Sequence, residues 1–174
     1  MAYLVLAYPK LNKSDYDWIQ GVREKEDKRY YGVVEPHFTI VFATDKLDLD
    51  KLISHTQEKI QGMKSIDISL ETTKTVKDDF QDIYHAFLIP STGYDEITKL
   101  HDILYTGALA SELREDLPYI PHVGIGTNKD EQPVKELTKQ IDDSGQHITG
   151  SINELTIVEY DGTKVVDLQT LPLG

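Results

Sequence analysis

The sequence PHFTI, at residues 36–40, returns as PHVGI at residues 121–125. We call these stretches the first and second cassettes; proline, histidine and isoleucine occupy the same places in both. Each cassette lies in an apolar, β-branched run of the kind that forms a strand. Because proline fits best at the first residue of a strand or at a sheet edge, His37 and His122 are expected near strand ends. The repeat therefore predicts two matching strands whose imidazoles face each other across a cleft.

Helical and strand patterns surround both cassettes in a similar order. Ser14 is the expected N-cap of a helix that runs to about Lys28, and the charged run at 23–29 is interpreted as its solvated face. Further helices are predicted at 49–62, at 94–104 and from Pro133 onward. Strands are predicted at 1–7, 37–42, 66–70, 84–89, 119–127, 155–160 and 164–168. The predicted fold is α+β, with two pseudo-symmetric lobes of antiparallel sheet and outer helices around a central cleft, in one bilobal domain over 1–174.

The composition argues against a membrane-spanning protein, a cysteine-dependent protein and a protein that binds long nucleic acids. The chain has 174 residues, 39% hydrophobic and 28% charged, and no apolar run is long enough for a membrane span. The apolar start at 1–7 is expected to be a strand rather than a signal peptide, so a cytoplasmic protein without a membrane partner is predicted. No cysteine is present, which excludes disulfides, thiolate zinc sites and thiol nucleophiles. A net charge of −12 argues against a long nucleic acid, although a few well-placed donors can still bind one phosphate.

The cassettes carry residue types suited to phosphodiester chemistry. Hydrolysis or cyclisation moves one proton off the attacking oxygen and another onto the leaving oxygen, and histidine does either near neutrality. Alternate residues of a strand share a face, so Thr39 would offer a hydroxyl beside the imidazole of His37. Two histidines suffice for such a reaction, so neither a cofactor nor a metal is expected.

Other uses of these residues must be weighed. One histidine in a strand is more often structural than catalytic, and it is the repetition that favours function. His55, His85, His101 and His147 lack the cassette and are expected to have surface or packing roles. Zinc would require a third ligand at suitable spacing, which the sequence does not offer. Gly124 and Gly126 form only a G-x-G within a strand and do not indicate a nucleotide-binding loop.

The two cassettes resemble the paired motifs of the 2H phosphoesterase superfamily, which includes bacterial 2′-5′ RNA ligase-like proteins and cyclic nucleotide phosphodiesterases. The resemblance covers nearly the whole chain. It implies that His37 and His122 are the catalytic pair, that Thr39 binds phosphate, and that the reaction needs no metal. It also implies a 2′,3′-cyclic phosphate or a 2′-5′ linkage, in a small nucleotide or an RNA end, as the substrate.

Gly124 departs from the family pattern, because the second cassette has glycine where a hydroxyl residue is expected. Three outcomes stay open: the Gly124 N–H contacts phosphate directly, a nearby hydroxyl such as Thr127 or a tyrosine replaces the missing one, or activity is weak. In a regular strand Thr127 faces away, whereas a bulge at Gly124 or Gly126 would reverse that. A non-catalytic nucleotide-binding protein and a 2′-5′ RNA ligase are the alternatives. Four tyrosines are candidates for base stacking or for burial: Tyr30, Tyr31, Tyr84 and Tyr119.

Overall fold

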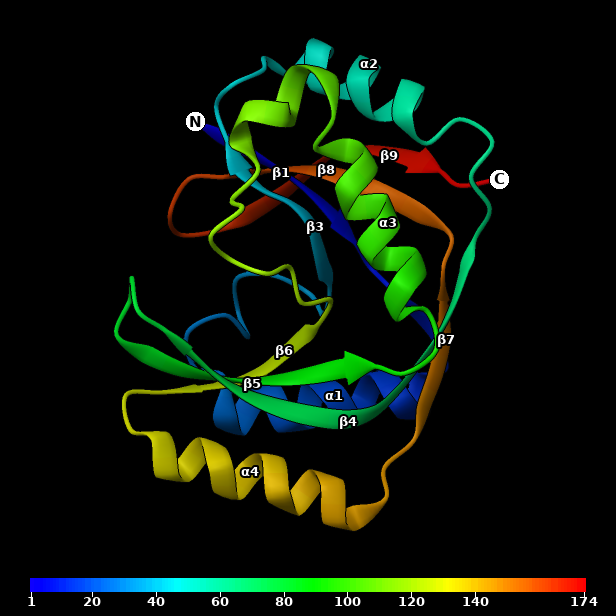
Figure 1. The fold of residues 1–174 in the computed structure, drawn as a ribbon. Helices are drawn as coiled ribbons and strands as arrows, with labels where there is room; N and C mark the ends of the chain where they lie inside the picture. The colour runs from blue at the N-terminus through cyan, green and yellow to red at the C-terminus, as the bar shows by residue number, and fades with distance from the viewer.

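Two antiparallel sheets form the frame of the protein, and each contains one cassette strand (Figure 1). The structure is a computed structural model that describes residues 1–174. The four-stranded sheet has the order β3-β1-β8-β9, and the five-stranded sheet has the order β2-β7-β4-β5-β6. The strands are β1 (Ala2–Ala7), β2 (Lys10–Leu11), β3 (Phe38–Thr44), β4 (Ile66–Asp78), β5 (Ile83–Pro90), β6 (Val123–Asn128), β7 (Ile148–Ile152), β8 (Glu154–Tyr160) and β9 (Val165–Pro172). The α+β class and the two antiparallel sheets predicted from the sequence are confirmed.

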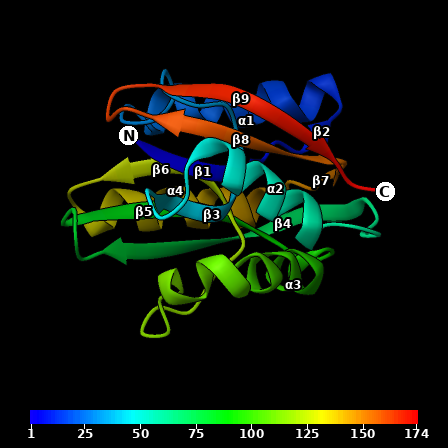
Figure 2. The same cartoon turned by 90° about the horizontal axis from the view of Figure 1, so that it is seen from above.

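The helices cover the outer faces of the sheets. They are α1 (Lys13–Glu26), α2 (Leu49–Lys59), α3 (Tyr94–Leu104) and α4 (Glu131–Ser144), with a short 3-10 helix η1 (Gly107–Glu112) after α3. α4 packs under β4 and β5, whereas α2 and α3 lie on the side of the four-stranded sheet (Figure 1). Seen from above, α1 and β9 lie on one side of the molecule and α3 on the other (Figure 2). None of the helices has both the length and the apolar character that crossing a bilayer requires.

Some local predictions are wrong. The N-cap of α1 is Asn12 rather than Ser14, because the Asn12 side chain accepts a hydrogen bond from Asp15 N and the helix already begins at Lys13. The strands β2 and β7 were not predicted, since β2 is two residues long and Thr, Gly and Ser interrupt the apolar pattern of β7. Gly150 is required where these strands pair, because a Cβ there would lie 2.4 Å from Lys10 O.

The repeat extends to the backbone of the two cassette strands. Leu6 pairs with Thr39 and Val5 with Val41, which leaves Ile40 as an extra residue in β3. In the same way Ile125 is the extra residue in β6, between Gly124 and Gly126. Each cassette strand thus has a β-bulge at the fourth residue after the proline. After the bulge, the side chains of the strand point to the opposite face of the sheet from the one that a regular strand would give them.

One hydrophobic cluster of 28 buried residues spans both sheets and fixes the cassettes in place. Phe38 and Ile40 enter it from β3, and Val123 and Ile125 enter it from β6, all four fully buried. The histidines lie one residue before each strand and are only partly buried. The apolar residues of each cassette therefore anchor the strand, while the residues between them are only partly buried.

Candidate active site

His37 and His122 have the same local geometry. His37 Nδ1 lies 2.8 Å from Glu35 O, and His122 Nδ1 lies 2.6 Å from Ile120 O. In both cases the carbonyl belongs to the residue two positions earlier, before the cassette proline. A carbonyl oxygen only accepts, so each Nδ1 carries the hydrogen and each Nε2 keeps its lone pair in the neutral ring. Both imidazoles are therefore held in the tautomer that accepts a proton at Nε2.

The two cassettes meet between the sheets. Tyr119, just before the second cassette, donates a hydrogen bond from its hydroxyl to Thr39 O in the first, at 2.9 Å, and Figure 1 shows the starts of β3 and β6 close together. His37 is also one of the groups that lower the pKa of His122, so a charge on one ring opposes a charge on the other. The hydrogen bond from Tyr119 thus joins the two cassettes that the repeat singles out.

Burial keeps both histidines neutral in the free protein. The pKa of His37 is lowered to about 4, chiefly by burial. The hydrogen bond to Glu35 O raises this pKa, and the positive charge of Arg23 lowers it further. Burial likewise lowers the pKa of His122 to about 4, against the bond to Ile120 O and together with His37 and His85. An anion placed between the rings would favour the protonated form of either one. Both rings are neutral near pH 7 in the free protein, and each can accept a proton at Nε2.

Thr39 and Gly124 occupy equivalent positions in the two cassettes, but Thr39 has a hydroxyl group and Gly124 has no side chain. The Thr39 hydroxyl has no hydrogen-bond partner within the chain and is partly buried two residues after His37. A Cβ at Gly124 would meet no heavy atom within 4 Å, whereas one at Gly126 would lie 2.9 Å from a Leu137 methyl carbon. The place of the missing hydroxyl is consequently open space rather than space filled by a neighbour.

The bulge decides how Thr127 is oriented. Thr127 pairs with His85 across β5 and β6, and Gly124 pairs with Phe87, so these four residues share one face of the sheet. The arrangement assumed for a regular strand, in which Thr127 faces away, is therefore wrong for β6. The Thr127 hydroxyl donates to Asp27 Oδ1 at 3.3 Å, so it is already used within the protein.

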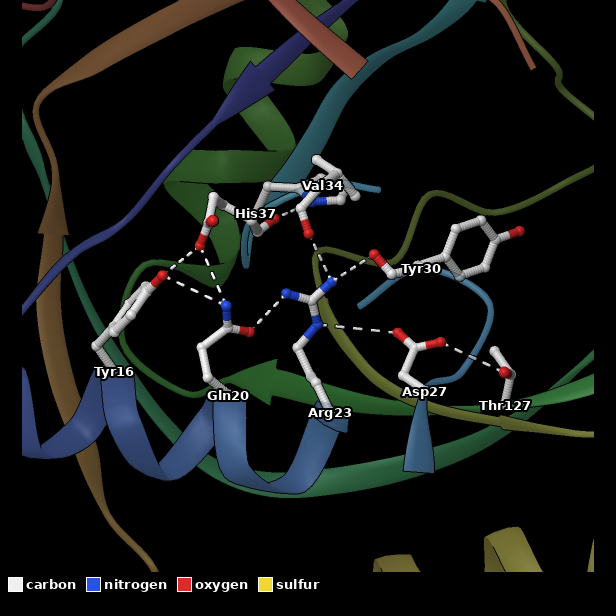
Figure 3. Close-up of polar contacts among 9 residues, drawn as sticks. Tyr16, Gln20, Arg23, Asp27, Tyr30, Val34, His37 and Thr127 are labelled. Carbon is white, nitrogen blue, oxygen red and sulfur yellow. Dashed lines mark hydrogen bonds and ion pairs between the residues drawn. The ribbon is translucent and has the colours of Figure 1, made fainter. Parts of the chain in front are cut away.

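A buried arginine on α1 fixes the loop that leads into the first cassette (Figure 3). Arg23 donates to Gln20 Oε1 at 2.8 Å, to Val34 O at 2.7 Å and to Tyr30 O at 3.2 Å, and its Nε lies 3.8 Å from Asp27 Oδ2. Arg23 is 1% exposed and Asp27 is 2% exposed. The prediction that the run at 23–29 is a solvated face is wrong at these two residues. Their spacing of four, in line with the buried Ile19, is the sequence signal that places them inward.

Glu35 is held on the other side of the same loop. Its Oε2 accepts hydrogen bonds from the Tyr16 hydroxyl and, at 3.2 Å, from Gln20 Nε2 (Figure 3). The carbonyl that orients His37 belongs to this residue. The position of the first imidazole therefore depends on α1 through both Arg23 and Glu35.

Tyr119 and His101 have structural roles. Their rings stack with centroids 3.7 Å apart, and His101 Nδ1 lies 2.8 Å from Ile40 O. The Tyr105 hydroxyl accepts a bond from Phe42 N at 3.0 Å. β3 is the edge strand of its sheet, and these side chains satisfy backbone groups that have no neighbouring strand. Tyr119 is consequently engaged within the protein rather than free to stack on a base.

The other histidines fall into two groups. His55 is buried with Nε2 2.8 Å from Leu104 O, and His147 is on the surface beside Glu71, as packing and surface roles would require. His85 differs, because it lies on the same face of β5 as Phe87 and its ring is 5.4 Å from that of Phe87. The sequence does not reveal His85, Phe87, Arg23 or Asp27 as neighbours of the cassettes, since their placement depends on strand register and loop path.

The fold and the paired histidines define a class: two-lobed α+β proteins with a repeated His-bearing strand. Two solved structures share this fold. Over 99% of this chain, TT0787 of Thermus thermophilus superposes with a TM-score of 0.65 at 14% identity, covering 98% of its own chain. Over 99% of this chain, E. coli LigT complexed with 3′-AMP superposes with a TM-score of 0.63 at 13% identity, covering 97% of its own chain.

Sequence comparison then identifies the family. Residues 11–164 match the model of the 2′-5′ RNA ligase superfamily. The chain belongs to this superfamily, which confirms the resemblance drawn from the two cassettes. A relative, "Putative phosphoesterase SH1944" of Staphylococcus haemolyticus (strain JCSC1435), is 25% identical over 152 residues, 86% of each chain.

Proposed function

We propose that this protein is a metal-independent phosphodiesterase that uses His37 and His122 as general base and general acid. The observation that carries the proposal is the shared geometry of these residues: each imidazole is fixed through Nδ1 to a carbonyl and keeps Nε2 free. Membership of the 2′-5′ RNA ligase superfamily and the phosphoesterase name of the relative support it. The substrate class is a 2′,3′-cyclic phosphate or a 2′-5′ linkage in a small nucleotide or RNA end.

The proposed reaction needs two proton transfers and no further reagent. One neutral imidazole takes a proton from water at Nε2 as the water oxygen bonds to phosphorus. The other imidazole, protonated in the presence of the phosphate charge, gives its proton to the leaving ribose oxygen as the P–O bond breaks. The products are a phosphomonoester and a free hydroxyl. The Thr39 hydroxyl and the Gly124 N–H stabilise the charge that develops on the non-bridging oxygens.

The charge near the first cassette opposes a long polyanionic substrate. A cavity of about 260 Å³ next to the first cassette is lined by Tyr8, Pro9, Leu11, Tyr16, Glu35, Pro36 and Asp167. Its two carboxylates, with the net charge of −12, oppose a long polyanion. LigT, whose solved structure holds 3′-AMP, gives a mononucleotide as the natural first probe.

The test is turnover in the presence of EDTA. Purified protein is incubated with 2′,3′-cyclic nucleotides and 2′-5′ oligoadenylate, and the products are followed by phosphorus NMR. His37→Ala and His122→Ala should each abolish turnover, whereas His147→Ala, on the surface beside Glu71, should leave it unchanged. Turnover that survives in either of the first two variants would contradict the two-histidine mechanism.

A non-catalytic nucleotide-binding protein is the second candidate, and Gly124 favours it. The open space there shows that nothing in the chain takes the position of the expected hydroxyl. Binding of 3′-AMP by calorimetry without product formation, unchanged by Gly124→Thr, would support this candidate. Ligation of RNA ends is the reverse of the proposed cleavage, and the acidic surface makes it the weaker alternative.

A further inference from the structure

Phe87 on β5 covers one face of the His122 ring. The two ring centroids are 3.5 Å apart and the planes are inclined by 16°. Phe87 is opposite Gly124 in the β5–β6 pair, and no side chain from Gly124 separates it from the second cassette. His122 is therefore fixed twice, in its plane by Phe87 and at Nδ1 by Ile120 O.

Two more rings continue this arrangement across the sheet. The His85 ring lies 5.4 Å from that of Phe87, and the Tyr30 ring lies 6.5 Å from that of His85 and within 19° of parallel. We call Tyr30, His85, Phe87 and His122 the ring column. Tyr30 belongs to the loop that Arg23 anchors and that leads to His37. The ring column thus connects His122 to the loop that positions the other histidine.

The repeated fold does not require the ring column. In the first half of the repeat, Leu6 is the residue opposite Thr39, as Phe87 is opposite Gly124. Leu4 precedes Leu6 by two residues, as His85 precedes Phe87. His37 meets only the Tyr8 ring, at 6.4 Å and 75°. Of the two cassette histidines, only His122 therefore has a ring stacked on its face.

We propose that Phe87 is a positioning residue for His122, which holds the ring with Nε2 toward the phosphate and stabilises its imidazolium form. This rests on the proposed function, in which His122 accepts or gives up one proton in each turnover. A cation over an aromatic face is attracted by the negative charge of that face, so Phe87 favours the protonated ring more than an aliphatic residue would. No carboxylate contacts His122 to play this part.

His85 is the titratable residue next to Phe87, and its charge would oppose a protonated His122 ring. Burial lowers the pKa of His85, against Asp78 and Asp27, which raise it, and together with Arg29, which lowers it. His85 Nε2 lies 3.5 Å from Asp78 Oδ2. The lowered pKa of His85 favours its neutral ring, so His85 does not favour a second positive charge beside Phe87.

The test compares Phe87→Leu with Phe87→Tyr. Leucine keeps an apolar cover without the aromatic face, so kcat should fall by about threefold to thirtyfold with KM changed by less than about twofold. The midpoint of the His122 imidazole titration, followed by nitrogen-15 NMR, should move to lower pH. Phe87→Tyr restores the ring and should restore both kcat and the midpoint. Phe87→Met serves as a second aliphatic variant if Phe87→Leu does not fold.

The control is Phe80→Leu, because Phe80 lies in the turn between β4 and β5 and is 77% exposed. A folded Phe87→Leu or Phe87→Met protein with an unchanged His122 midpoint would overturn the inference. If the wild-type protein cleaves no phosphodiester, the proposed function fails, and the NMR comparison alone decides the role of Phe87.

Discussion

Individual residues decide whether the site is complete, and Gly124 matters most among them. The position of His37 and His122 at the start of two matching strands could be predicted from the sequence, because the repeat gives each histidine the same neighbours. The face on which Thr127 lies could not, because the bulge at Ile125 is a property of how β6 pairs with β5. The contact of Phe87 with the second cassette could not be predicted either, because it depends on the register between β5 and β6.

Gly124→Thr should increase activity. A Cβ there would meet no heavy atom within 4 Å, so the first atom of a side chain has room, and threonine would place a hydroxyl at the position that corresponds to Thr39. We expect kcat/KM for a 2′,3′-cyclic nucleotide to rise by about tenfold to a hundredfold, the range that one hydrogen bond to a charged group can contribute. Steady-state kinetics measures this, with Gly124→Val as the matched control that adds bulk without a hydroxyl. Equal rates for Thr and Val would show that the hydroxyl is not what the site lacks.

The low pKa values of His37 and His122 predict loss of stability in acid. In the unfolded chain each histidine takes up its proton near pH 6.5, whereas in the fold it does so only near pH 4. Unfolding therefore binds protons in this window, so the free energy of unfolding should fall from pH 6.5 to pH 4. Urea denaturation across this range measures it. The double variant His37→Gln, His122→Gln should have a shallower dependence on pH, and an unchanged slope would contradict the assignment.

Among the elements, α1 and the loop after it contribute most to positioning. The sequence predicts this helix apart from its N-cap, because the signals there are local. It does not predict that Arg23 and Asp27 turn inward, since charged residues are buried only when a particular loop supplies partners for them. β2 and β7 were missed because their pairing depends on a close approach at Gly150.

Arg23→Met should destabilise the protein by about 3–5 kcal/mol, because it leaves the Asp27 carboxylate buried without its cation. It also removes the bonds to Val34 O and Tyr30 O, so the loop into His37 should loosen and kcat should fall. Urea denaturation gives the stability change. Lys25→Met on the exposed side of α1 is the control, and an Arg23→Met protein as stable as that control would show that the ion pair contributes little.

Over the whole molecule, the repeat explains the fold better than it explains the site. Both halves present a proline, a histidine bonded to the carbonyl two residues earlier, and a bulged isoleucine. The α+β class with two antiparallel sheets follows from this repetition and could be predicted. The site is asymmetric, because Thr39 and Gly124 differ and only His122 has a ring stacked on its face. The two halves share a backbone but differ at single side chains. The repeat shows which residues differ, but it does not show which side chains from other strands lie beside them.

The most direct test of the central claim is an NMR titration of the six histidines with 3′-AMP. The claim is that His37 and His122 meet on one phosphate. We expect the Nε2 resonances of both to shift together, with one saturation curve and with titration midpoints raised from about 4 because the phosphate charge favours the imidazolium forms. His55 and His147 should stay unchanged. A response from only one of the two cassette histidines, or from neither at saturating nucleotide, would contradict the account.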